Sequence, residues 1–335
     1  MKAAFADRYG PPEVVEIREV ERPAPTDDQV LIRVRAASVN RADLDGLKPK
    51  PGFVRLFMGL RAPRNREVGI DAAGVVEAVG PGVTRFKAGD EVMTDLFASG
   101  RFGAFAEYVC AREKAFEPIP TGMSFEEAAT LPHSAVLALQ GMRMRNGRTF
   151  RPGNAVLIDG ASGNVGPFAV QIAKAMGAKV TGVARGDKLD FVRSLGADHV
   201  IDYEKVDFTT ARERYDWIVA VDSHHSIRAA RRALKPNGVY LTMGGDSASI
   251  FASLGGSLVM SRFGDKWSGL MLWWKPLHRP DVDHLKELIA AGKVRPVIDR
   301  RYPLSQVVEA LRWVEDGNAT GKVVISISDP EGTRT

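Results

Sequence analysis

The chain has 335 residues, of which 44% are hydrophobic, 26% charged and 8% aromatic. This length exceeds one ordinary domain and the composition excludes a disordered or fibrous protein, so we expect two globular domains. The formal net charge of +5 comes from basic residues scattered along the chain without interleaved aromatic side chains, which argues against nucleic-acid binding.

No targeting or membrane-spanning segment is recognisable. The first residues lack the apolar core and cleavage site of a signal peptide, and no segment has the roughly 18 uninterrupted apolar residues of a membrane span. We therefore expect a cytoplasmic protein without stable membrane insertion. Cys110 is the single cysteine, so neither a disulfide nor a cysteine-rich zinc site can form within one chain.

The pattern of predicted secondary structure changes near residue 120. Residues 1–120 contain short runs of β-branched residues separated by turns rich in glycine and proline, which predicts a β-rich first domain. Ser124 and Glu127 then have the spacing of a capping box, so a helix is expected to begin near residue 125.

Strands and helices alternate after this point. Strands are predicted at 155–160, 179–184, 199–203, 215–222, 239–245 and 322–327, and helices at 165–177, 188–196, 226–234, 282–291 and 305–315. Alternation with short connections predicts a parallel sheet that is covered by helices on both faces.

The first strand of this series runs directly into a glycine-rich turn. The turn reads Ala161-x-Gly163-x-x-Gly166, between an apolar strand and an amphipathic helix. A side chain at these glycines would hold a pyrophosphate away from the backbone N–H groups, so the pattern predicts a dinucleotide site. A glycine turn without a ligand is the alternative.

The end of the next strand indicates which dinucleotide binds. A carboxylate usually holds the ribose hydroxyls of NAD at this place, but here Ala184 is followed by Arg185 and Lys188. These cations would attract a 2′-phosphate, so NADPH is expected in preference to NADH. Asp187 would favour NADH if its carboxylate turned inward, and the alternative for Arg185 and Lys188 is that they are only surface charges.

The order of these segments is similar to that of the medium-chain dehydrogenase/reductase superfamily. Within it the chain resembles the zinc-independent quinone oxidoreductase (zeta-crystallin-like) branch. The matching segments are VNRADLDG, GIDAAGVVEAVGPGVTRFKAGDEV, GAFAEYV, SFEEAATLP, VLIDGASGNVG, VRSLGADHVIDY and the C-terminal stretch from GKVRPVIDRRY to GKVVISI.

The resemblance implies an α/β protein with two domains. A GroES-like, β-rich catalytic domain would comprise residues 1–122 and 279–335, and a Rossmann cofactor domain with a doubly wound parallel sheet would comprise residues 123–278. It also implies a homodimer and an active site in a cleft between the domains.

The resemblance further implies that catalytic zinc is absent. Zinc-dependent relatives carry a Gly-His-Glu run where this chain reads Gly69-Ile70-Asp71, so Ile70 stands at the position of the histidine ligand. The relatives' cysteine in the VN…D segment is missing too. Without its thiolate and imidazole ligands, a zinc site is not expected.

Asn40 and Asp43 of the VNRAD segment are expected to border the catalytic cleft. Asn40 would donate a hydrogen bond to a developing oxyanion, or would only tie a turn. No general acid is assigned, because the tyrosine that several related reductases place after this segment is missing. Leu137 replaces a frequent threonine near the nicotinamide, so that polarising contact is either lost or taken over by His133 or Ser134.

On the cofactor side, the resemblance assigns contacts along the carboxyl edge of the sheet. Pyrophosphate would be contacted by Ser162, Gly163, Asn164 and Val165, the adenosine phosphate by Arg185, Lys188 and Tyr203, and other parts of the cofactor by His224, Gly244 and Gly245. For His224, a turn or core role is the alternative.

These features predict a zinc-independent, NADPH-dependent oxidoreductase that transfers hydride to quinones or α,β-unsaturated carbonyl compounds. Its partner would be a small planar acceptor, whose conjugated π system accepts hydride without a Lewis acid. One alternative is an enoyl reductase for one secondary metabolite or acyl thioester, and another is a non-catalytic NADPH-binding sensor or interaction protein. The Met- and Trp-rich residues 251–276 would form a lid over the substrate, or else a dimer interface or covered core.

Overall fold

The structure is a computed structural model that describes residues 1–49, 52, 55–143, 147–245, 264–271 and 274–327. These residues form two compact units. Unit 1 comprises residues 1–136, 275–283 and 296–335, and unit 2 comprises residues 137–274 and 284–295. In this division residues 123–136 and 275–278 group with unit 1 and residues 284–295 with unit 2, whereas the resemblance implied 123–278 for the cofactor domain and 279–335 for the catalytic domain.

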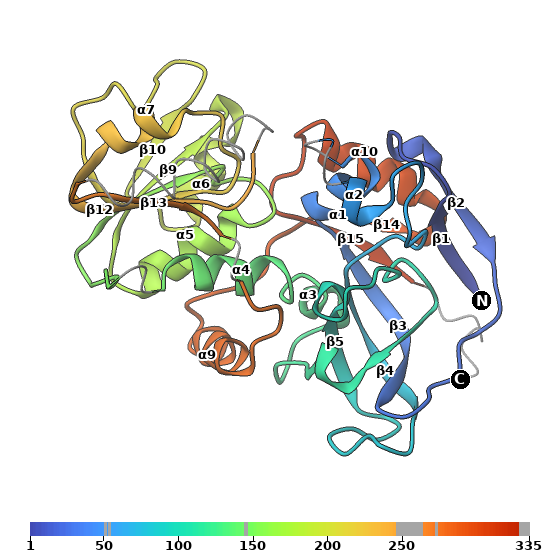
Figure 1. Ribbon diagram of the computed structural model, residues 1–335. Helices are drawn as coiled ribbons and strands as arrows, with labels where there is room; N and C mark the ends of the chain where they lie inside the picture. Colours follow the sequence, from blue (N-terminus) through green and yellow to red (C-terminus); the bar gives the residue numbers. More distant parts are fainter. Residues whose placement is uncertain (50–51, 53–54, 144–146, 246–263, 272–273, 328–335) are drawn as a thin grey trace. The chain divides into compact units, whose positions relative to one another are not determined.

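Unit 1 is built on a sheet of seven strands, in the order β14-β15-β3-β4-β5-β7 with β6 pairing on β3. Figure 1 labels β14, β15, β3, β4 and β5 of this sheet. The strands are β3 (Gln29–Val39), β4 (Asp71–Val79), β5 (Glu91–Asp95), β6 (Tyr108–Arg112), β7 (Phe116–Pro118), β14 (Ile298–Pro303) and β15 (Lys322–Ser326). A separate antiparallel pair joins β1 (Lys2–Ala6) and β2 (Val15–Glu19). The expected β-rich domain is confirmed, and it includes the last strand of the chain.

The helices of unit 1 are short. They are α1 (Arg41–Leu47), α2 (Arg55–Met58), α3 (Phe125–Ala128) and α10 (Val307–Glu315), with 3₁₀ turns η1 (Pro12–Val14), η3 (Leu96–Ser99), η4 (Glu113–Ala115) and η6 (Leu304–Gln306). Ser124 and Glu127 form the predicted capping box at the start of α3. Helix α10 presents an apolar stripe at helical spacing to the core of unit 1, as expected from the sequence.

Unit 2 contains a parallel six-stranded sheet in the order β10-β9-β8-β11-β12-β13. The strands are β8 (Ala155–Asp159), β9 (Lys179–Ala184), β10 (His199–Asp202), β11 (Tyr215–Ala220), β12 (Leu234–Thr242) and β13 (Trp267–Leu270). The strand order reverses beside β8, because the chain moves first to β9 and β10 and then to β11 on the other side. In open α/β sheets a ligand binds at this reversal, outside the carboxyl ends of the strands.

Several connections between the strands of unit 2 contain helices. They include α5 (Gly166–Ala175), which packs on β8 and β9, α6 (Leu189–Ser194), which follows η5 (Gly186–Lys188), and α7 (Ile227–Arg232). Helices α4 (Ser134–Gly141) and α9 (Arg279–Ala290) each contain a boundary between the units.

Strand β13 was not predicted from the sequence. It pairs with β12 through residues 267–270, inside the apolar segment that was interpreted as a lid or an interface. Most of that segment, residues 251–263 and 272–273, lies outside the described residues. Among the helices that the structure describes, none is both long and apolar enough to span a bilayer.

Candidate functional site

A cluster of buried polar side chains lies inside unit 1. Each member is at most 9% exposed. The members are Asn40, Asp43, Asp71, Asp95, His133, Ser134 and Lys322. Buried polar groups are costly unless they are paired, so the arrangement depends on its hydrogen bonds.

Asn40 is the centre of the cluster. It is the N-cap of α1, where its backbone N–H donates to Oδ2 of Asp43 at 2.7 Å. Its side-chain Nδ2 donates to Oδ2 of Asp71 at 3.0 Å, and its Oδ1 accepts from Lys322 Nζ at 2.6 Å and from Ser134 Oγ at 3.1 Å. The amide donor that was expected to face an oxyanion thus faces a carboxylate in this structure.

Lys322 supplies a positive charge to the interior of the cluster. It begins β15, is 1% exposed, and also donates to Ser134 Oγ at 3.0 Å. Burial lowers the pKa of this amine to about 8, against the attraction of Asp71, Asp43 and Asp95. At neutral pH Lys322 is therefore an ammonium that compensates part of the buried negative charge.

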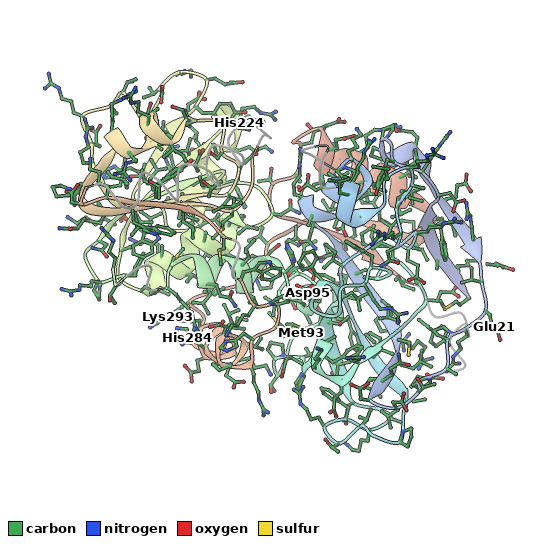
Figure 2. All side chains as sticks on the ribbon, in the orientation of Figure 1. Glu21, Met93, Asp95, His224, His284 and Lys293 are labelled. Atoms are coloured by element: carbon green, nitrogen blue, oxygen red, sulfur yellow. The ribbon has the colours of Figure 1, made fainter. Side chains whose placement is uncertain are left out.

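The opposing charges are the carboxyl groups of Asp71 and Asp95. Burial and the nearby Asp95 raise the pKa of Asp71 to about 7. His133 lies between them: its backbone N–H donates to Asp71 Oδ2 at 3.3 Å and its Nδ1 lies 3.2 Å from Asp95 Oδ2. Burial pushes the pKa of His133 down, but the hydrogen bond and charges of its neighbours outweigh this and raise it. Figure 2 shows Asp95 inside unit 1.

Asp71, Asp95 and His133 offer ligand atoms within 4.8 Å of one another, a spacing at which they could share a metal ion. Oδ2 of Asp71 and Nδ1 of His133 are engaged in hydrogen bonds, whereas Oδ1 of Asp71 is buried and has no hydrogen-bond partner among the described residues. Ile70, at the expected imidazole position, is fully buried and supplies no ligand atom. The residues therefore do not reproduce the zinc site of the zinc-dependent relatives.

A pocket of about 240 Å³ opens beside this cluster, within unit 1. Its walls combine apolar side chains such as Leu47, Met58 and Phe102 with charged ones such as Asp43 and Arg64. Apolar walls with a few polar groups are typical of sites for small organic ligands.

Aromatic rings connect the pocket wall with the polar cluster. Phe97 of η3 is 44% exposed and packs edge-on against Phe102, with 6.5 Å between ring centroids. On its other side the ring of Phe97 lies 6.3 Å from that of His133, again edge-on. A planar acceptor would find an aromatic surface here.

In unit 2 the glycine turn follows β8 as predicted. A Cβ on Gly166 would lie 2.2 Å from the carbonyl oxygen of Gly160, so this glycine allows the helix to pack on the turn. At Gly163 the nearest atom to such a Cβ is 3.8 Å away, so this position borders open space. Ser162 and Val165 are each 8% exposed, and Asn164 is partly exposed. An open glycine at a helix N-terminus fits the diphosphate of a dinucleotide.

The residues after β9 form an ion pair. Arg185 Nε and Nη2 donate to the two carboxylate oxygens of Asp187 at 2.7 and 2.8 Å. Asp187 thus faces Arg185, while Lys188 is only 6% exposed. Tyr203, which follows β10, is 55% exposed and lies close enough to feel the charge of Arg185. Arg185, which was expected to contact the adenosine phosphate, therefore has its charge partly neutralised by Asp187.

The remaining predicted cofactor residues lie beyond β11 and β12. His224 is on the surface of unit 2 with its Nε2 3.3 Å from Asp222 Oδ1 (Figure 2). Gly244 and Gly245 follow β12, and Gly245 bridges to Ser223 with a φ of 135° that favours glycine. All three follow the carboxyl ends of neighbouring strands.

Sequence reasoning missed Asp95 of the buried cluster and two further buried ionisable residues, Lys322 and Asp159. Lys322 was included only in a predicted final strand, and its position at the start of an apolar strand was the available signal. Asp159 ends β8 directly before the glycine turn. Burial and the nearby Asp222 raise its pKa to about 7. The sequence signal for Asp159 was a carboxylate at the end of an apolar strand, directly before a phosphate-binding turn.

Comparisons with known proteins cover nearly the whole chain. Residues 26–121 match the family described as alcohol dehydrogenase GroES-like domain, and residues 195–325 match that described as zinc-binding dehydrogenase. The 2-methylene-furan-3-one reductase of Solanum lycopersicum is 32% identical over 97% of this chain and 79% of its own. The NADPH-dependent alkenal/one oxidoreductase of Arabidopsis thaliana is 31% identical with the same coverage.

The solved structures include the quinone oxidoreductase from Coxiella burnetii, which is 28% identical with a TM-score of 0.84 over 98% of this chain and 99% of its own. The chain belongs to the medium-chain dehydrogenase/reductase superfamily, in its quinone oxidoreductase branch. The predicted family and fold class, a GroES-like domain with a Rossmann domain, are confirmed.

Proposed function

We propose that this protein is an NADPH-dependent reductase that transfers hydride to quinones or α,β-unsaturated carbonyl compounds. The observation that carries the proposal is the similarity, over nearly the whole chain, to relatives named alkenal/one oxidoreductase and quinone oxidoreductase. The apolar pocket of unit 1 and the open glycine turn of unit 2 support it.

When bound, the reduced nicotinamide supplies the hydride. The residues of the chain bind and orient the reactants and manage protons. Backbone N–H groups at the start of α5, beside Gly163, would hold the diphosphate. The rings of Phe97 and Phe102 would stack against a planar acceptor. The hydrogen bonds around Asn40 would hold the buried polar cluster beside the pocket in place.

The preference for NADPH over NADH is part of the proposal. Arg185 and Lys188 follow β9, where a carboxylate would serve NADH. The pairing of Arg185 with Asp187 moderates this preference, because a 2′-phosphate would compete with Asp187 for the guanidinium group.

Turnover without zinc, a homodimeric state and a cytoplasmic location are proposed as well. Two observations support metal-independence: the buried ammonium of Lys322 compensates part of the negative charge of the carboxylates, and Ile70 supplies no ligand atom at the expected imidazole position. Elemental analysis of the active enzyme before and after chelation tests it: we expect less than stoichiometric metal and unchanged turnover. Stoichiometric zinc required for turnover would contradict it.

The test of the activity is NADPH oxidation with 1,4-benzoquinone, 9,10-phenanthrenequinone, 2-alkenals and crotonyl thioesters as acceptors. We expect turnover with quinones or alkenals. Turnover with the thioester alone would favour an enoyl reductase. NADPH binding, measured by calorimetry, without turnover of any acceptor would favour a sensor or interaction protein.

A further inference from the structure

Helix capping provides a hydrogen-bond partner for only one of the two carboxyl oxygens of Asp43. Its Oδ2 accepts the hydrogen bond from the Asn40 backbone N–H, as in a capping box. Its Oδ1 has no hydrogen-bond partner among the described residues, although the side chain is almost completely buried. Leaving a buried carboxylate oxygen unpaired is costly, so the geometry favours a protonated carboxyl group.

Asp43 also lines the 240 Å³ pocket of unit 1, so the side chain that carries the unpartnered oxygen borders a space that a small ligand can enter. The other charged residues around this pocket are Arg64, Arg66 and Glu67. A carboxyl group in such a position can exchange a proton with a bound ligand.

Burial and the neighbouring buried charges set the pKa of the Asp43 carboxyl group. Burial raises the pKa of Asp43 to about 7, the hydrogen bond from Asn40 opposes this, and Asp71 adds to the rise. His133 and Lys322 pull in the other direction. A general acid works best when its pKa lies near the operating pH.

We propose that Asp43 is the proton donor that completes the reduction of α,β-unsaturated carbonyl acceptors. The inference rests on the proposed function. The β-carbon of the acceptor receives a hydride from the reduced nicotinamide, and the π electrons of the C=C bond move onto the carbonyl to give an enolate. A C–H bond then forms at the α-carbon with the proton of Asp43 Oδ1, the O–H bond breaks, and water returns a proton to the carboxylate.

The reduction of quinones depends less on Asp43 as a proton donor. Their reduction product is protonated on oxygen, and proton exchange between oxygen and water is fast. Protonation of carbon is slow, so only the alkenal reaction depends strongly on a positioned acid. The two acceptor classes therefore distinguish a proton donor from a residue that only shapes the pocket.

Asp43→Asn tests the inference, because the amide oxygen still accepts the Asn40 N–H while the proton donor is lost. We expect kcat for a 2-methyl-2-alkenal to fall about 10²-fold, with little change for 1,4-benzoquinone. In wild type this kcat should decline above pH about 7, and the variant should lack that decline. Asp45→Asn, on the exposed face of the same helix, is the matched control and should behave as wild type.

Product stereochemistry gives a second readout. In D₂O the wild type should place deuterium on one face of the α-carbon, and Asp43→Asn should label both faces. Unchanged alkenal kcat and retained facial selectivity would overturn the inference, as would an equal loss for both acceptors with selectivity intact. Failure of the wild type to reduce either acceptor would instead refute the proposed function itself.

Discussion

Replacing Lys322 with methionine should strongly destabilise unit 1. The substitution keeps the length of the side chain but removes the ammonium that bonds Asn40 and Ser134 and faces three buried carboxyl groups. Removing one partner of a buried ion pair costs about 3–5 kcal/mol. For a domain of this size, about 2–4 °C of Tm is lost per kcal/mol, so the expected loss is roughly 6–20 °C.

The pH dependence of this loss follows from the same charges. Asp43 and Asp71 can take up protons when the ammonium is missing, since burial places their pKa values at about 7. The loss in Tm should therefore be larger at pH 8 than at pH 5.5, which calorimetry can measure. Lys87→Met removes an exposed ion pair and is the control, with an expected effect of about 0–1 kcal/mol. Equal losses for the two variants, or no difference between the two pH values, would refute the reasoning.

Three further predictions concern the cofactor and the buried acid. Gly163→Val should weaken NADPH binding in calorimetry by about tenfold or more with little change in Tm, because its side chain would enter open space where a diphosphate is expected; unchanged affinity would contradict the site. Arg185→Gln should lower affinity for NADPH but not NADH, whereas Asp187→Asn should increase the preference for NADPH by releasing the guanidinium group; parallel changes for both coenzymes would exclude a phosphate contact. Asp43→Asn should raise Tm more at pH 8 than at pH 5. Because the pKa of Asp43 is raised in the folded protein, the wild type loses stability as the pH rises through about 7, where the buried carboxyl group must ionise. The amide of the variant does not ionise, so the variant does not lose this stability. A pH-independent difference in Tm would show that Asp43 is not protonated in the folded protein.

The sequence predicted most of unit 2 correctly because its signals are local. The turn at Gly160, Gly163 and Gly166, the apolar strand before it and the helix after it all lie within a few residues of one another. The capping box of Ser124 and Glu127 is likewise a contact between near neighbours. Strand β13 was missed because a short strand depends on the partner with which it pairs.

Local pattern could not reveal how the buried charges are paired. Asn40 and Asp43 were singled out from the sequence, but the residue that holds the Asn40 amide, Lys322, lies 282 positions away. Their hydrogen bond forms because β15 pairs antiparallel with β3, which places the first residue of one strand beside the end of the other. The sequence alone determined the family, the two kinds of domain and the phosphate-binding turn. The tertiary structure decided which carboxyl oxygens remain unpartnered, those of Asp43 and Asp71 among them, and which cation is buried with them, because burial and charge depend on distant segments that meet only in the folded chain.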